Sequence, residues 1–368
     1  MEIDRRAFLA LAGMGACIAA MPRLADAMDG GDPLFLSSAE LPEGTHAIQV
    51  LTERGDILAS FPVSDRGHGA AVHHGTGRVV AFARRPGTFA LAFDRQRLAT
   101  PGTLTAQSGR HFYGHGTFSP DGRLLYATEN DFERGEGRIG LYDATDGYRR
   151  LGEFPSGGVG PHDMALMPDG RTLVIANGGI ETHPDFDREK LNLPTMKPLI
   201  TLLDRKTGEL LEQHEAPASL HQVSLRHMAI ATNGDIWVAG QFEGPAWETP
   251  PLLARVRQGE GLKLFSAPQR AQISLNNYMA SIALSGDETT LAITAPRGNR
   301  LTFWNAETGA YLDGVDLTDC GGVAANRSGG FLISSGEGDL VHASRQHPGS
   351  SWSRTSVPVR WDNHLTGL

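Results

Sequence analysis

Short apolar runs separated by polar, glycine-containing turns repeat along the chain. The segment 112–122, FYGHGTFSPDG, joins a histidine and a short apolar run to a Pro-Asp-Gly turn. The same plan returns at 159–170, VGPHDMALMPDG, and in a degraded form at 225–235, LRHMAIATNGD. His68, His115 and His162 follow one another at intervals of 47 residues. A period of this size with strand and turn content is typical of a β-propeller.

The repeats divide the chain into complete blades and a partial blade at each end. The complete blades begin at His68, His115, His162, His227, Tyr278 and Gly321. We expect the first of them to end near Ala99 and the last near Ser344. Strand-like runs at 34–38, 46–51 and 57–63 form an N-terminal blade that lacks its innermost strand, and the C-terminal segment 361–368, WDNHLTGL, supplies that strand. Such closure removes the open sheet edges.

The resulting fold prediction is all-β: one seven-bladed β-propeller domain over residues 28–368, closed by the C-terminal strand. Asp-Gly and Asn-Gly turns support it, because they supply the positive φ that tight hairpins need. After the N-terminal segment, no helical pattern competes with the strands. A pair of β-sandwiches is the alternative fold, but it leaves the two partial blades unexplained.

The third complete blade carries an insertion at 179–198, GIETHPDFDREKLNLPTMKP. It is polar, contains three prolines and shows no strand pattern. Insertions in repeat proteins map to loops on one face, often the binding face. We therefore expect this segment to be a lid or docking loop.

Residues 1–27 have the pattern of a twin-arginine export signal. Arg5-Arg6 precedes a short apolar run, and Ala25-Asp26-Ala27 offers a cleavage site after Ala27. We expect a periplasmic protein whose signal is removed, and the alternative is a lipoprotein modified at Cys17. No later segment has the roughly 20 apolar residues of a membrane-spanning helix.

Composition excludes several classes of function. The net charge is -9 and no long run of one charge sign occurs, which argues against a nucleic-acid partner. The two cysteines, Cys17 and Cys320, cannot build a disulfide framework once the signal is removed. The chain also lacks a G-x-S-x-G elbow, an H-E-x-x-H helix motif and a P-loop. Because C-x-x-C-H is absent as well, we expect no covalent haem.

Five of the fourteen histidines lie at or near the start of a predicted innermost strand. In a propeller these strands line the central channel, so their first residues open on one face. Neutral imidazole is the commonest metal ligand and suits iron, copper, zinc and nickel. We therefore predict a metal site at the channel mouth formed by His68, His115, His162, His227 and His364. In the fifth and sixth complete blades, Asn277, Tyr278, Asp319 and Cys320 occupy the equivalent places.

Two uncertainties of position stay open at this point. Counting back seven residues from Gly122 and Gly234 reaches His115 and His227, but counting back from Gly170 reaches Asp163. Asp163 is thus an alternative inward group to His162. Each histidine can equally be structural, forming a hydrogen bond to a neighbouring blade.

Other polar groups are weaker candidates. In the insertion, Glu181 and His183 alternate as metal-ligand types, and a solvated loop is the plainer interpretation. Arg226 either binds a carboxylate or phosphate or pairs with an acid, and Arg84 and Arg85 favour an ion pair between blades.

Several segments together resemble a bacterial family of exported proteins of unknown function. They are GPHDMALMPDGRTLVIANGGIETHPD, LNLPTM, SLRHMAIATNGDIWVAGQFEGP, NYMASIALS and WDNHL, beside the run that starts at Phe112. The resemblance covers essentially the whole chain after the signal. It implies a YVTN-like, quinoprotein-like seven-bladed propeller, often encoded beside imelysin-type and di-haem peroxidase-like proteins of iron uptake. No activity is established for such a family.

Three functions are compatible with these observations. The first is a periplasmic metal-binding propeller, accessory to iron acquisition, that holds iron or copper at the channel mouth. The second is a non-catalytic scaffold for imelysin-type or di-haem partners, in which the histidines are structural. The third is a metal-dependent redox enzyme, although no sequence feature identifies a substrate.

Overall fold

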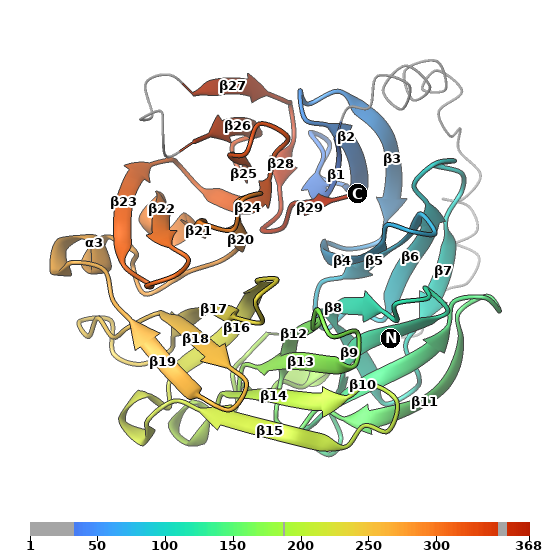
Figure 1. Cartoon of the computed structure of the whole chain (residues 1–368). Coiled ribbons are helices and arrows are strands. Elements are labelled where there is room, and N and C mark those ends of the chain that lie inside the picture. Colours follow the sequence, from blue (N-terminus) through green and yellow to red (C-terminus); the bar gives the residue numbers. More distant parts are fainter. Residues whose placement is uncertain (1–32, 187, 345–351) are drawn as a thin grey trace.

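A computed structural model describes residues 33–186, 188–344 and 352–368. Seven antiparallel sheets stand around one axis like the blades of a propeller (Figure 1). The fold prediction is therefore confirmed. The expected signal segment, 1–27, lies outside the described residues.

The N-terminal blade contains β1 (Leu34–Glu40), β2 (His46–Thr52) and β3 (Ile57–Val63). The next two blades contain β4 (Gly67–His73), β5 (Arg78–Ala83), β6 (Phe89–Asp94) and β7 (Gly102–Thr105), then β8 (Arg110–Phe118), β9 (Leu124–Asp131), β10 (Glu136–Asp143) and β11 (Arg149–Pro155). The blade with the insertion contains β12 (Pro161–Leu166), β13 (Thr172–Asn177), β14 (Leu199–Asp204) and β15 (Leu210–Glu215).

The three remaining blades follow the same order from the axis outward. They contain β16 (Val223–Ile230), β17 (Ile236–Phe242), β18 (Leu253–Arg257) and β19 (Gly261–Phe265), then β20 (Ile282–Leu284), β21 (Thr290–Ala295), β22 (Arg300–Asn305) and β23 (Tyr311–Asp316), then β24 (Cys320–Ala325), β25 (Phe331–Ser335), β26 (Asp339–Ala343) and β27 (Ser353–Ser356). The short helices are η1 (Pro184–Phe186), η2 (Leu193–Thr195), η3 (Ala218–Leu220), α3 (Gln269–Ser274) and η4 (Pro296–Gly298).

The apolar core lies between neighbouring blades. Every residue of β13, β14 and β21 is buried, because each face of these strands packs against another blade. The outermost strands β11 and β15 instead alternate between exposed and partly buried residues. The largest fully buried side chains include Trp237, Trp304 and Tyr126. This burial explains why the strand runs read as continuous apolar segments rather than alternating ones.

The two ends of the chain close the ring as predicted. β28 (Arg360–Trp361) and β29 (Thr366–Gly367) both pair with β1, so the N-terminal blade obtains its innermost strand from the C-terminus. The sequence predicted one continuous strand here, but residues 362–365 leave the ladder. In that break the Ser37 hydroxyl donates to the His364 carbonyl oxygen at 2.7 Å.

Two boundaries and one element differ from the sequence prediction. The blade that begins with β4 continues to Thr105 rather than Ala99, and the blade that begins with β24 continues to Ser356 rather than Ser344. Both missed strands are short and mostly exposed, so they carry little apolar pattern. The six-residue helix α3 was also missed; Pro268 precedes it and only Gln272 within it is buried. No helix in the described part of the chain is long and apolar enough to span a membrane.

Closure of the ring depends on close backbone contact at Gly322. A Cβ atom there would lie 2.7 Å from the Leu365 nitrogen and 2.8 Å from the His364 carbonyl carbon. We expect Gly322→Val to lower the free energy of unfolding by about 1–3 kcal/mol, the usual cost of overpacking. Urea denaturation measures it, with Gly152→Val as control, because no atom lies within 4 Å of a Cβ built on Gly152. Equal stability of the two variants would contradict this account of closure.

Candidate metal centre

Four histidines from four consecutive blades converge on the propeller axis. His68 of β4, His115 of β8, His162 of β12 and His227 of β16 each place a ring nitrogen within 4.8 Å of the nitrogens of the other three. All four side chains are buried. We call this group the four-histidine cluster. The sequence prediction that these residues meet is confirmed, although whether they bind a metal remains a proposal.

A β-bulge brings each of these histidines to the axis. The register between the innermost strand and its neighbour shifts between Gly67 and Ala70, between Phe112 and Gly116, between Pro161 and Asp163, and between Leu225 and His227. A bulge adds a residue to one strand and redirects its side chain. The same irregularity therefore recurs at the start of all four of these blades, and there it delivers an imidazole to the channel.

Glycines provide room for the crowded rings. A Cβ at Gly114 would lie 2.5 Å from Cδ2 of His68, and one at Gly69 would lie 2.7 Å from Nδ1 of His115. Gly114 also has a φ of +107°, which side chains other than glycine rarely adopt. Neighbouring blades thus interlock at the axis, each glycine facing the histidine of the other blade.

His364 lies beside the cluster, in the break between β28 and β29. Its Nε2 is 3.3 Å from Nε2 of His68, and its ring centroid is 4.6 Å from that of His227. Its Nδ1 lies 3.3 Å from the Ser281 hydroxyl, a neighbour that the sequence did not suggest. His364 therefore reaches the axis as predicted but stands outside the group of four.

Asp163 and His162 both contribute, which resolves the ambiguity left by the sequence. The bulge at Pro161 and Asp163 turns His162 into the cluster, where its Nε2 is 3.0 Å from Nε2 of His227. Asp163 approaches Nδ1 of His115 to 3.2 Å and accepts the Met228 backbone N–H at 2.9 Å. Burial alone would raise the pKa of Asp163, yet the contact with His115 holds it below its ordinary value.

Several cluster nitrogens are buried without a hydrogen-bond partner among the described residues. They are Nε2 of His115, Nδ1 of His68 and Nδ1 of His227. An unpaired polar atom in a buried place costs free energy, so it usually indicates a missing partner. In His115 the carboxylate of Asp163 occupies Nδ1 and leaves Nε2 free, the arrangement that orients metal-binding histidines.

The spacing of the nitrogens suits one metal ion. Ligand nitrogens about 2.0–2.1 Å from a metal lie about 3.0 Å apart at right angles and about 3.3 Å apart at the tetrahedral angle. The Nε2 atoms of His162 and His227 are 3.0 Å apart, and those of His68 and His364 are 3.3 Å apart. These two pairs already have ligand spacing, and the nitrogens of the four-histidine cluster lie within 4.8 Å of one another, so the rings must draw closer together to hold one transition metal.

The buried rings are held in the neutral form that metal binding requires. Burial, followed by the neighbouring histidines, lowers the pKa of His68, His162 and His364 well below the ordinary value. The pKa of His227 falls to about 3 for the same reason. Neutral imidazole is the ligating form, so the site needs no deprotonation at pH 7.

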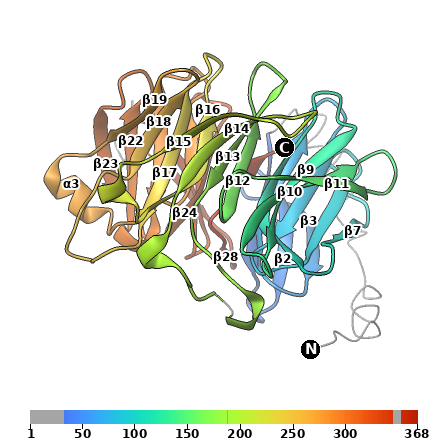
Figure 2. The same ribbon diagram turned by 90° about the horizontal axis from the view of Figure 1, so that it is seen from below.

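The insertion lies on the mouth face but does not enter the cluster. Its lower-edge position between β13 and β14 is visible in Figure 2. His183 packs edge-on against Phe132 with ring centroids 5.1 Å apart, and the Glu181 backbone N–H donates to Asn192 Oδ1 at 2.8 Å. Glu181 and His183 are thus placed outside the four-histidine cluster. An ion pair between Lys190 and Glu243 ties the insertion to the next blade.

The remaining candidates have structural partners. Cys320 is buried and its thiol donates to the Arg300 carbonyl oxygen at 3.1 Å, and burial raises its pKa to about 12. The Asn277 side chain donates to the Glu248 carbonyl oxygen. Desolvation, followed by the nearby Glu337, raises the pKa of Asp319. None of these residues belongs to the cluster.

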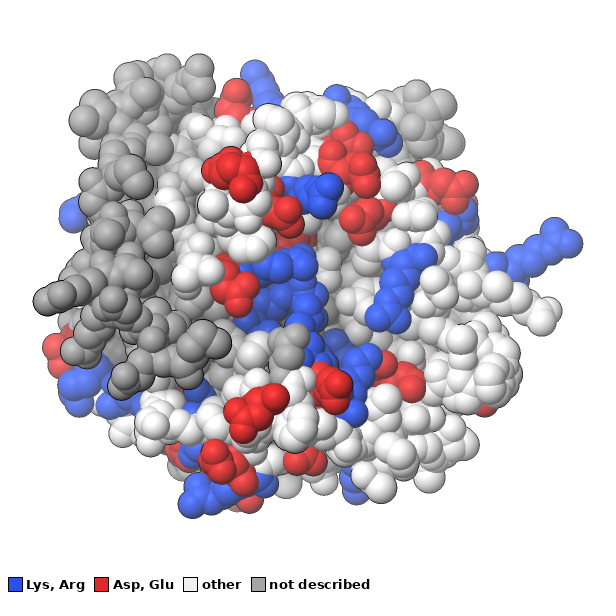
Figure 3. All heavy atoms as spheres, turned by 180° about the vertical axis from the view of Figure 1, so that it is seen from behind, with Lys and Arg blue, Asp and Glu red and all other residues white. Residues whose placement is uncertain are grey.

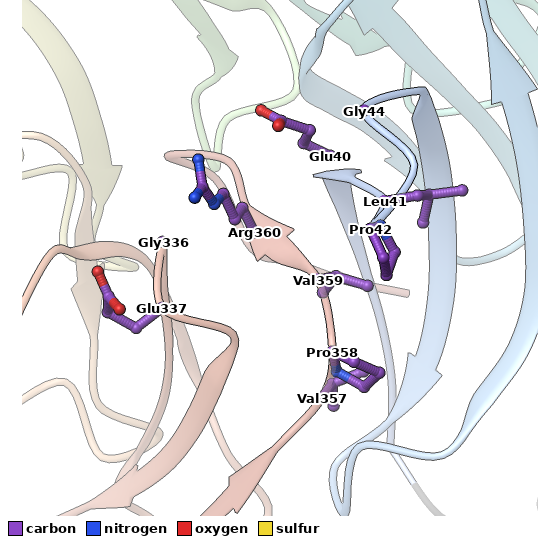
Figure 4. A pocket seen from close by; sticks show the side chains of 10 residues that line it. All are labelled: Glu40, Leu41, Pro42, Gly44, Gly336, Glu337, Val357, Pro358, Val359 and Arg360. Carbon is purple, nitrogen blue, oxygen red and sulfur yellow. The ribbon is translucent and has the colours of Figure 1, made fainter.

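A separate pocket of about 410 Å³ lies between the last blade and the N-terminal blade. Glu337 lies on one side of it, Glu40 on the other, and Arg360 reaches between them (Figure 4). No histidine lines this pocket. Its charged groups are two carboxylates and one guanidinium, so it offers no comparable set of metal ligands.

Comparisons with known proteins agree with the fold. A family model described as "Protein of unknown function (DUF1513)" matches residues 61–368. No curated protein sequence matches the chain. Among solved structures, hydrazine synthase of Kuenenia stuttgartiensis is similar with a TM-score of 0.59 and 14% identity, covering 86% of this chain and 94% of that one. The Cps50 (Swd1) β-propeller domain of Myceliophteria thermophila has a TM-score of 0.58 and 12% identity, covering 89% and 94%. At these identities the likeness shows the fold alone.

The buried histidines predict a pH-dependent stability of the metal-free protein. Because their pKa values are lowered by folding, the unfolded chain binds more protons than the folded chain below about pH 6.5. Stability should therefore fall as the pH decreases from 7 toward 4, by about 1.4 kcal/mol per pH unit for each histidine that stays neutral. Urea denaturation at several pH values measures the slope. The variant His364→Gln should show a shallower slope, and an unchanged slope would contradict the assignment.

Proposed function

This chain belongs to the DUF1513 family, and we propose that it is a metal-binding β-propeller that holds iron at the mouth of its channel. The observation that carries the proposal is the environment of His115. Asp163 fixes one nitrogen of this ring; the other nitrogen is buried, has no hydrogen-bond partner among the described residues and is close to three further imidazoles. A structural role would leave each ring nitrogen hydrogen-bonded to a neighbouring blade.

The donor set limits the choice of metal. Imidazole nitrogens suit iron, copper, zinc and nickel, whereas calcium and magnesium prefer oxygen ligands. Imidazole side chains bring no negative charge, and the carboxylate of Asp163 is in contact with the cluster. Iron is the preferred assignment because the sequence resembles a family encoded beside iron-uptake proteins, and copper is the alternative with the same ligands.

The biological setting that we propose rests on the sequence. The twin-arginine pattern in residues 1–27 supports export to the periplasm before the chain meets its partners. Twin-arginine export suits a protein that folds, or loads a cofactor, before it crosses the membrane. We propose that the loaded propeller serves iron acquisition as an accessory protein.

A scaffold for a partner protein is a second candidate, favoured by one surface. The loop after β17 exposes Trp247 at 83% of its area, and the adjoining α3 exposes Ile273 at 55%. The side chain of Gln272 in α3 donates to the Pro250 carbonyl oxygen, which joins the two segments. Exposed aromatic and aliphatic groups of this kind suit an imelysin-type or di-haem partner.

Metal analysis tests the first proposal. We expect about one equivalent of iron, by elemental mass spectrometry, in the protein purified from its native compartment or titrated with ferrous ions. The double variant His115→Ala/His227→Ala should lose that metal. The matched control His73→Ala/His74→Ala removes two histidines at the far end of β4, outside the cluster, and should retain it. Wild-type protein that takes up neither iron nor copper would favour the scaffold.

Asp163 should act as a positioning residue. Replacing it by asparagine keeps its shape but removes the charge that orients His115. We expect Asp163→Asn to weaken metal affinity by about 10- to 100-fold, as loss of such an orienting carboxylate does. Competition with a chelator of known affinity measures the change. An unchanged affinity with normal folding would contradict the positioning role of Asp163.

A further inference from the structure

The mouth face carries positive charge at its centre, although the chain as a whole has a net charge of -9. Figure 3 views this face, and Lys and Arg side chains gather at its centre while acidic side chains stand around them. The metal site proposed above lies under this region. A basic entrance is unexpected for a protein that takes up free metal cations, because it repels them.

Two arginines of this region are built into the walls of the channel. Arg226 directly precedes His227; its guanidinium is buried and pairs with Glu243 at 3.2 Å. Arg84 follows β5, and its guanidinium approaches Asp362 to 3.5 Å. The carboxylates of Asp362 and Glu243 are themselves buried. These pairs therefore hold guanidinium groups at the mouth without exposing a carboxylate there.

Three further arginines form no ion pair with any described residue: Arg85, Arg188 and Arg297. The Arg297 guanidinium lies 4.3 Å from the centre of the Tyr278 ring, which fixes it without neutralising it. Burial, followed by repulsion from Arg226, lowers the pKa of Arg85 to about 10. Arg188 is exposed and contributes to the same field, since it also acts on Arg84, Arg85 and Arg226.

A buried hydroxyl nearby also lacks a partner. Tyr113 is 2% exposed; the Thr182 hydroxyl lies close to its hydroxyl, but neither group makes a well-formed hydrogen bond to a described residue. The segment that carries Arg85 runs beside it, because the Phe112 backbone N–H donates to the Gly87 carbonyl oxygen at 2.9 Å. An unpaired donor beside an unpaired guanidinium is what an absent oxyanion would leave behind.

We propose that the mouth is a vestibule for a multivalent oxyanion, which binds to the unpaired guanidinium groups of Arg85 and Arg297 and reaches the metal with one of its oxygens. The metal half of this inference rests on the proposed function. The chemistry is complementary: neutral imidazoles leave a bound cation without negative ligands, and an oxyanion supplies them. Arginine favours carboxylate and phosphate groups because its planar fork binds two oxygens at once. The metal would then arrive as an anionic complex, drawn in by the same field.

Calorimetric titration of citrate and of inorganic phosphate tests the vestibule. Both metal-free and iron-loaded protein are titrated, at low and at high salt. We expect at least one of the two anions to bind the metal-free protein, to bind the loaded protein more tightly, and to weaken with salt. The preferred probe distinguishes a polycarboxylate from a phosphate ligand.

Variants separate the vestibule from the metal site. Arg85→Gln and Arg297→Gln should each weaken anion binding by about tenfold or more, and Arg297 is exposed, so its variant does not threaten folding. Both variants should retain their affinity for iron alone or gain some, since a nearby positive charge is removed. Arg97→Gln is the matched control, an exposed arginine in the turn after β6 at the opposite end of its blade.

The outcomes are distinct. Absence of anion binding in both forms, or binding that neither arginine variant weakens, would overturn the vestibule whatever the metal result. Anion binding that depends on Arg85 in a protein that takes up no metal would refute the proposed function and leave the vestibule standing.

Discussion

The close packing of imidazoles on the propeller axis is the constraint on which the rest of the site depends. Four rings from consecutive blades and a fifth from the closing segment share one small, buried volume. Burial keeps His68, His162, His227 and His364 neutral, and nearby histidines add repulsion between any protonated forms. Burying such a group of imidazoles lowers the stability of the fold unless a ligand binds them. A metal ion would bind tightly here, because its ligands are already deprotonated and held close together.

The backbone carries this constraint into the fold. Bulges at the start of the innermost strands turn the histidines inward, and Gly69 and Gly114 let rings from neighbouring blades pass one another. The C-terminal segment brings His364 as it completes the N-terminal blade. The same C-terminal segment therefore closes the ring and adds the fifth histidine, so a change that weakens ring closure also disturbs the histidines on the axis.

The charges around the mouth differ from those deeper in the channel. Buried pairs such as Arg226 with Glu243 hold guanidinium groups beside the histidines, while Arg85 and Arg297 keep their charge unpaired. This arrangement favours an anion at the entrance and a cation beneath it. A propeller suits such a layered site, because every blade delivers the first residue of its innermost strand to the same face.

The sequence by itself determined the blade number, the ring closure and the convergence of the histidines. These follow from local turn chemistry and from a strand period that each blade repeats. In a repeat, residues at the same position of each unit take the same position in each blade. Only the tertiary structure decided that His162 and Asp163 both serve the site, because a bulge in the register between two strands separates them. It also placed Glu181 and His183 away from the cluster and gathered Arg85, Arg226 and Arg297 at the mouth. Loop packing and contacts between residues far apart in the chain produce these arrangements, and no local pattern encodes them.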